Sequence, residues 1–152
     1  MKAASICRQK CVTISVSDGL AAAAKLMRDE HIGFLVVVEP GTSKERGSAP
    51  VGVITDRDIV VAVVARDADP GALRVGDVMT PDPVVVRSDA SLENVARMMR
   101  DSGIRRAPVV DVNGRACGVV SIDDILDVLA RQLTDLAALI RNERRIEQVT
   151  RI

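Results

Sequence analysis

A hydroxyl residue followed three positions later by an aspartate occurs twice in this chain, each time at the end of a short apolar run that begins with glycine. The two copies read Gly52-Val-Ile-Thr55-Asp-Arg-Asp58 and Gly118-Val-Val-Ser121-Ile-Asp-Asp124. A hydroxyl and an acid at this spacing can form a capping box, in which each side chain bonds to a backbone N–H of the first helical turn. Taken alone, the pattern predicts the start of a helix and a structural role.

The same parts also suit a ribose phosphate. A helix N-terminus with a hydroxyl group is a ready anion site, and an aspartate beside it can accept two hydrogen bonds from a vicinal diol. A glycine in the preceding strand lets a flat ligand lie against the backbone. Because the motif recurs at equivalent places, its repetition favours a binding site that is built twice.

The two motifs belong to a longer internal repeat. Residues 25–32 (KLMRDEHI) are matched by residues 97–104 (RMMRDSGI) at an offset of 72, and residues 52–60 are matched by residues 118–126 at an offset of 66. The difference places a longer loop in the first copy, between Glu39 and Val51. Repeats of this size bury too little surface to be stable alone, so we expect the two copies to pack together.

Each copy predicts the order β-α-β-β-α. A β-branched run at 12–14 or 84–86 precedes an amphipathic helical pattern, which Ser17 or Asp18, and in the second copy Ser88 or Asp89, could cap. Two apolar runs follow, at 34–38 and 51–55 in the first copy and at 107–110 and 116–121 in the second, where Asn113-Gly114 predicts a hairpin. A second helix is expected over 56–66 and from residue 122 onward.

Composition narrows the class of protein. The net charge is zero, and the chain has no Trp or Tyr and one Phe, which argues against a nucleic-acid partner. No signal peptide or membrane span is recognisable, and three cysteines without a pairing pattern favour a reduced, cytoplasmic protein. Cys7, Cys11 and His31 are too few for a structural zinc site. We therefore expect no metal and no catalytic residues.

Three segments together resemble the CBS-domain family, specifically a stand-alone tandem pair (Bateman module). They are VGDVMTPDPVVV at 75–86, the SLENVARMM that begins at residue 91, and IRRAPVVDVNGRACGVVSIDDIL at 104–126. The resemblance implies an α+β fold of two β-α-β-β-α repeats packed sheet to sheet about a pseudo-twofold axis. We expect residues 1–66 to form the first repeat, 67–83 a linker and the start of the second repeat, 84–130 the second repeat, and 131–152 a C-terminal helical extension.

The resemblance also implies a set of ligand contacts. Asp58 and Asp124 would hold ribose hydroxyls, and Thr55 and Ser121 would reach toward phosphate. The base would meet the main chain and aliphatic side chains of four residues in the first strand segments, Thr13, Ile14, Val85 and Val86. Arg57 and Arg106 are candidates for phosphate, because a guanidinium binds phosphate through two hydrogen bonds.

The expected function is that of a non-enzymatic regulatory sensor. It would bind AMP, ADP, ATP or S-adenosylmethionine between the repeats, require no cofactor, form a homodimer and signal to an effector protein in trans, with no nucleic-acid or membrane partner. The alternative is a structural or interaction protein whose clefts are empty. The stripe of Leu129, Leu133, Leu136 and Ile140 is suited either to self-association or to packing back on the domain.

Overall fold

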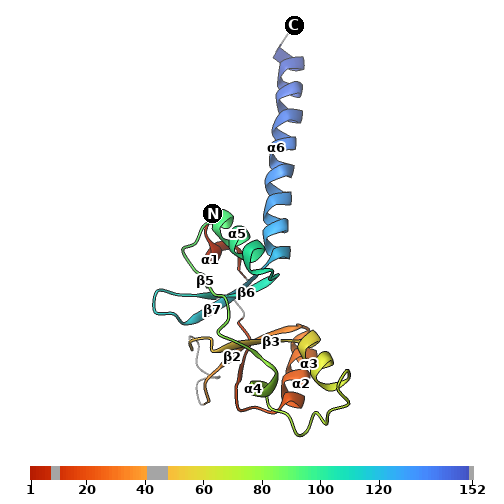
Figure 1. The fold of residues 1–152 in the computed structure, drawn as a ribbon. Helices are drawn as coiled ribbons and strands as arrows, with labels where there is room; N and C mark the ends of the chain where they lie inside the picture. Colours follow the sequence, from red (N-terminus) through yellow and green to blue (C-terminus); the bar gives the residue numbers. More distant parts are fainter. Residues whose placement is uncertain (8–10, 41–47, 151–152) are drawn as a thin grey trace.

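The computed structural model describes residues 1–7, 11–40 and 48–150, with side chains up to residue 146. Its elements in chain order are α1 (Ala3–Ile6), β1 (Thr13–Ser15), α2 (Leu20–Glu30), β2 (Phe34–Val38), β3 (Gly52–Thr55), α3 (Asp56–Val63), α4 (Val75–Val78), β4 (Thr80–Pro81), β5 (Val86–Arg87), α5 (Leu92–Ser102), β6 (Arg106–Val110), β7 (Ala116–Ser121) and α6 (Ile122–Thr150). Figure 1 shows two halves, with α6 extending from one of them.

The strands form two sheets with the same internal plan. In the first sheet, of order β1-β2-β3-β4, β1 runs parallel to β2 and β3 runs antiparallel to it. In the second sheet, of order β5-β6-β7, β5 and β6 are parallel and β6 and β7 antiparallel. The predicted tandem repeat and its α+β class are therefore confirmed.

Strand β2 explains why the two sheets pack face to face. All five of its residues are buried, and successive side chains point to opposite sides of the sheet. Leu35 and Val37 join the core beneath α2, whereas Phe34, Val36 and Val38 form a separate cluster with Ala116 of β7. This second cluster joins the sheets, as the resemblance implied.

The opening segments of the two halves are exchanged. Ala3 of α1 is fully buried in the core of the second half, and its N–H donates to the carbonyl of Ala90 at 2.8 Å. Val75 of α4 is buried in the core of the first half, and β4 pairs with β3. Residues 67–83, expected as a linker and the start of the second repeat, thus supply a helix and a strand to the first half.

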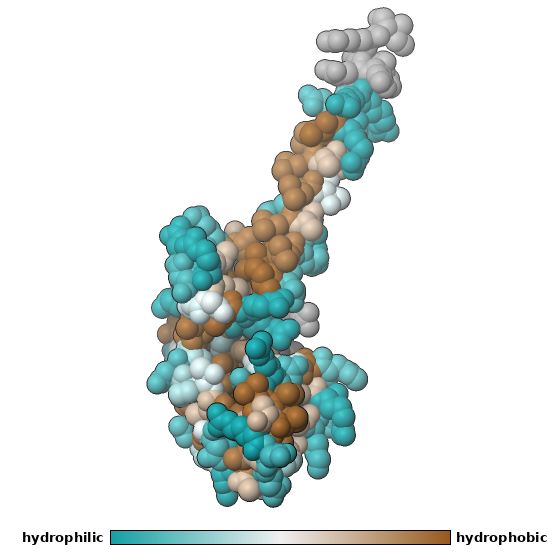
Figure 2. Space-filling view, turned by 45° about the vertical axis from the view of Figure 1, so that its right-hand side comes forward, coloured by the Kyte–Doolittle hydropathy of each residue, from teal (hydrophilic) through white to brown (hydrophobic). Residues whose placement is uncertain are grey.

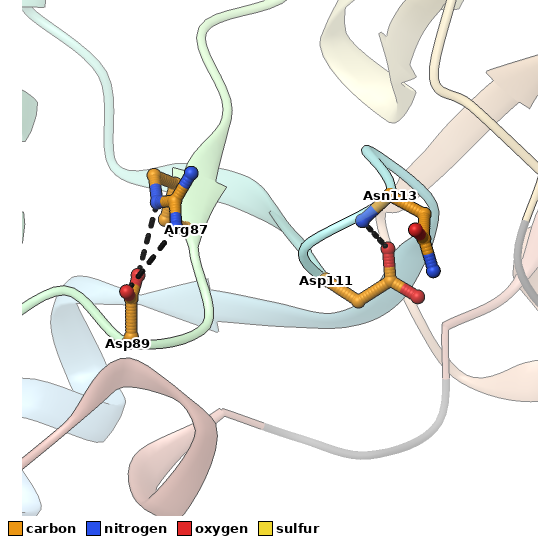
Figure 3. Close-up of polar contacts among 4 residues, drawn as sticks. All are labelled: Arg87, Asp89, Asp111 and Asn113. Atoms are coloured by element: carbon orange, nitrogen blue, oxygen red, sulfur yellow. Dashed lines mark hydrogen bonds and ion pairs between the residues drawn. The ribbon is translucent and has the colours of Figure 1, made fainter.

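Helices α2 and α5 begin at other N-cap residues than those predicted. The N-cap residues are Gly19 and Ser91, so the predictions of Ser17 or Asp18, and of Ser88 or Asp89, were wrong. The carboxylate of Asp18 instead accepts a bond from the N–H of Ser15 at 3.0 Å. Asp89 pairs with Arg87 at 3.0 Å (Figure 3), which lowers the pKa of Asp89. Both acids stabilise the turn before the helix, and the helix begins only beyond it.

Two other boundaries also moved. The strand expected at 84–86 begins at Val86, the first residue that pairs with β6, and Val84 and Val85 precede it. Helix α3 ends at Val63 and not at residue 66. The N–H of Ala65 bonds to the carbonyl five residues earlier, and Asp67 adopts a left-handed conformation (φ 51°), which ends the helix.

The hairpin predicted at Asn113-Gly114 is present between β6 and β7. Gly114 has a φ of 77°, the conformation that favours glycine. One carboxylate oxygen of Asp111 accepts a bond from the N–H of Asn113 at 2.8 Å (Figure 3). The same oxygen accepts a bond from the N–H of Arg115 at 2.9 Å. The turn is therefore closed by its own residues.

Helix α6 follows β7 without a break and is 29 residues long. It contacts β7, α1 and α5, and its later turns extend away from the body of the molecule (Figure 1). Within the described part of the chain, no helix has both the length and the apolar character needed to cross a bilayer.

Candidate ligand-binding site

The two repeated motifs adopt the same hydrogen-bonded geometry. In the first, the N–H and the hydroxyl of Thr55 donate to Oδ2 of Asp58 at 2.8 and 2.7 Å, and the N–H of Asp58 donates back to Oγ1 at 3.2 Å. In the second, Ser121 and Asp124 make the same three bonds at 2.8, 2.6 and 3.2 Å. The predicted capping box is therefore confirmed in both copies.

Each motif is placed by a strand that passes directly into a helix. Thr55 is the last residue of β3 and pairs with Phe34, the first residue of β2. Ser121 is the last residue of β7 and pairs with Arg106, the first residue of β6. The strand pairing thus holds each hydroxyl–acid motif beside the residue that begins the neighbouring strand.

A cavity of about 150 Å³ lies at the second motif, between the two halves. The second half contributes Arg106, Val119, Ser121, Asp123 and Asp124, and the first half contributes Val12, His31, Ile32, Gly33 and Phe34. The cavity therefore has an apolar side and a polar side with a hydroxyl, two carboxylates and two basic groups. Neither half alone could form it.

Three of the predicted site residues line this cavity, namely Arg106, Ser121 and Asp124. The remaining seven are placed elsewhere: Thr13, Ile14, Thr55, Arg57, Asp58, Val85 and Val86. Ile14 and Val86 are buried in the first and second core, respectively. Their side chains are thus committed to packing, so a ligand could meet these two residues only through the main chain.

His31 lines the cavity, a role that the sequence did not suggest. His31 is the C-cap of α2, with a φ of 54°. Gly103, its counterpart in the second repeat, has a φ of 65°. The internal repeat could have pointed to this part of the chain. Phe34 is the counterpart of the predicted contact Arg106, it lies three residues after His31, and both Phe34 and Arg106 line the same cavity.

The cysteines contribute no reactive group to the site. Helix α1 ends at Ile6, so Cys7 and Cys11 do not share a helical face. Burial raises the pKa of Cys11 to about 11, with smaller contributions from Cys117 and Cys7. Its thiol is thus neutral near pH 7. Among the residues that the structure describes, no three His, Cys, Asp or Glu side chains are grouped so as to hold a metal ion.

Comparison with curated proteins finds relatives across most of the chain. It is 33% identical over 123 residues to MK0525, an uncharacterized protein of Methanopyrus kandleri. The match covers 81% of this chain and 60% of the relative. The chain therefore spans less than two thirds of that relative's length.

Two solved structures have the same fold. The CBS domain pair of MJ0100, in complex with 5′-methylthioadenosine and S-adenosyl-L-methionine, has a TM-score of 0.72 and is 26% identical, covering 85% of this chain and 99% of that one. CBSX2 in complex with AMP has a TM-score of 0.69 and is 25% identical, covering 88% and 98% of the two chains.

A sequence profile of the CBS domain matches residues 3–65 and 75–131. The two matched ranges correspond to the two repeats of the sequence and include both hydroxyl–acid motifs. The chain therefore belongs to the CBS domain family and contains two of its repeats.

Proposed function

We propose that the chain is a regulatory sensor that binds an adenine nucleotide or another adenosine derivative between its repeats. The observation that carries the proposal is the cavity that joins Ser121, Asp124 and Arg106 of the second half to residues of the first half. The two solved CBS pairs described above bind adenosine compounds, which supports the same ligand class here.

Asp124 is the proposed ribose contact. A carboxylate has about four acceptor positions, and the bonds from Ser121 both end on Oδ2. A ribose diol would donate to the same carboxylate, which Ser121 orients. The Ser121 hydroxyl has one proton, which it donates to Asp124, so its role in this geometry is to orient the carboxylate.

The phosphate contact is assigned to basic groups instead. Arg106 and His31 line the cavity from opposite halves, and a guanidinium is suited to bidentate phosphate binding. The apolar wall formed by Val12, Ile32, Phe34 and Val119 would hold the base. A cavity of about 150 Å³ holds a small aromatic molecule, so we place one edge of the adenine against the apolar wall and the sugar and phosphate at the mouth of the cavity.

We propose that the first motif belongs to a second ligand site, related to the one at Ser121 and Asp124. Thr55 and Asp58 repeat the bonds of Ser121 and Asp124, and Arg57 lies between them in sequence. We keep Thr55, Arg57 and Asp58 as ligand contacts of a related cleft, together with the main chain of Thr13, Ile14, Val85 and Val86.

Binding would be relayed by a change in packing. A ligand held between the two halves contacts both, so it favours whichever arrangement of the halves fits it better. The proposal contains no catalytic step. The output would be a change in dimer contacts or in the binding of a partner protein.

Calorimetric titration of the full chain with AMP, ATP and S-adenosylmethionine tests this function. We expect saturable binding of at least one of them, and at least a tenfold loss of affinity in Asp124→Ala. Asp135→Ala, an exposed acid farther along α6, is the matched control and should bind normally. Asp58→Ala reports separately on the first motif.

The competing structural function is favoured by one observation, the complete capping box in both motifs. It predicts that Asp58→Ala and Asp124→Ala each lower the free energy of unfolding by about 1 kcal/mol and that no adenosine compound binds. Because the sensor also predicts the loss of stability, the titration decides between the two. No heat with all three ligands, for a folded wild-type protein, would reject the sensor.

A further inference from the structure

One ionisable group in the lining of the cavity has no part in the function proposed so far. The carboxylates among the described lining residues are Asp123 and Asp124, and the basic groups are Arg106 and His31. Asp124 is bonded to Ser121 in the capping box. Asp123 is outside that box and is exposed. Its carboxylate therefore lies at the cavity without a role in orienting the ribose contact.

A third carboxylate lies next to the part of the wall that the first half supplies. Gly33 lines the cavity, and a Cβ placed on Gly33 would lie 2.5 Å from Oδ2 of Asp56. The carboxylate of Asp56 thus occupies the space beside this glycine. The cavity therefore has acidic groups on both of the halves that form it.

The equivalent positions of the repeat carry the opposite charge. Arg57 is the counterpart of Asp123, at the offset of 66 residues, and Arg105 is the counterpart of Gly33, at the offset of 72. An acid in the first turn of a helix is favoured by the helix dipole, yet the first repeat has an arginine there and forms the same capping box. The fold therefore accepts either charge at this position, and the acid at position 123 is not needed to begin the helix.

These charges affect how many phosphates the cavity can hold. Arg106 and His31, the proposed phosphate contacts, can meet one phosphate group. Each further phosphate adds negative charge near Asp123, and like charges a few Å apart repel each other. A ligand with two or three phosphates would therefore bind less tightly than one with a single phosphate or none.

We propose that Asp123 is a specificity-determining residue, which makes the cavity select adenosine compounds with at most one phosphate and disfavour nucleoside di- and triphosphates. This inference rests on the proposed sensor function and specifies its ligand class. Because Arg57 stands at the equivalent place, the first motif does not share this selectivity.

Calorimetric titration with S-adenosylmethionine, AMP and ATP, in buffer without divalent cations, tests the selectivity. All proteins carry Asp58→Ala, so that the cavity is measured without the first motif. We expect ATP to bind at least about tenfold more weakly than the tighter of the other two ligands. Asp123→Arg, which copies Arg57, should narrow this difference by about fivefold or more, and Asp123→Asn should narrow it by a smaller factor.

Asp135→Arg is the matched control. It makes the same change of charge on α6, the helix that projects from the body of the molecule in Figure 2, and should leave the difference between the ligands within about twofold of its original value. Circular dichroism should show that every variant keeps its helix content. Added salt should reduce the discrimination against ATP, because it screens exposed charges.

The outcomes separate this inference from the sensor function. ATP that binds as tightly as the other ligands, a difference that Asp123→Arg leaves unchanged, or a discrimination that salt does not alter would each overturn the role of Asp123 and leave the sensor intact. A folded wild-type chain that binds none of the three ligands would reject the sensor, and the inference with it.

Discussion

His31 shows how one residue can serve the fold and the site at once. It ends α2 in the left-handed conformation that Gly103 adopts at the equivalent place, and it is also one of the residues that line the cavity beside the second motif. A residue with a Cβ is strained in this conformation, by about 1 kcal/mol. That cost is understandable if the imidazole contributes to binding.

Substituting His31 by glycine should separate the two roles. We expect His31→Gly to raise the free energy of unfolding by about 0.5–1 kcal/mol, because glycine removes the backbone strain. The affinity for a phosphate-bearing ligand should fall at the same time. Urea denaturation followed by circular dichroism measures the first effect and calorimetry the second.

The reverse substitution in the second repeat is the control. Gly103→Ala places a Cβ at a φ of 65° and should destabilise the protein by about 1 kcal/mol without a direct effect on the cavity. A His31→Gly variant that is less stable than the wild type would show that the imidazole makes contacts worth more than the strain.

At the scale of the elements, the exchanged segments α1 and α4 determine how the halves are joined. Ala3 lies in the core of the second half although it precedes the whole first repeat in sequence. Val75 lies in the core of the first half although it opens the second repeat. The pattern of residues predicts a short helix locally. Which of the two cores that helix packs against depends on which core has an uncovered apolar surface in the folded molecule.

A charge placed on each side of α1 should reveal this exchange. Ala3→Glu buries a carboxylate in an apolar core, so we expect it to lower the free energy of unfolding by about 3 kcal/mol or more. Ala4→Glu, at the next and exposed position, is the matched control and should change stability by less than about 0.5 kcal/mol. Chemical denaturation of both variants decides. Equal effects would show that α1 is not packed as described.

At the scale of the whole molecule, the exchange makes the two halves one folding unit. Each core contains a residue from the other sequence repeat, Ala3 in the second half and Val75 in the first. Phe34, Val36 and Val38 join the two sheets across their inner faces. The cavity lies at this junction. Any ligand there is therefore linked to the packing of the whole body.

Cooperative unfolding is the expected consequence. Hydrogen exchange under increasing urea should show the buried strands β2 and β6 opening with the same free energy, because neither core survives without the other half. The outer turns of α6 should exchange separately and faster in the monomer. Different opening free energies for β2 and β6 would contradict a single folding unit.

Much of this description follows from local sequence. The repeat, the order of the elements within it, the hairpin at Asn113-Gly114 and both capping boxes follow from residue types and short spacings, and each was predictable from the sequence. The site was only partly predictable. Ser121 and Asp124 were candidates from the motif, and Arg106 was a candidate from the family resemblance, whereas His31 and Val12 line the cavity from the other repeat.

Tertiary structure decided what sequence spacing cannot encode. Gly19 and Ser91 cap the helices because Asp18 and Asp89 are used by the preceding turns, a competition that composition alone does not resolve. The exchange of α1 and α4, and the joining of the second motif to residues of the first repeat, depend on contacts between segments far apart in the chain. The sequence by itself determined two copies of one local design; only the packing of these copies against each other determined the cavity between them.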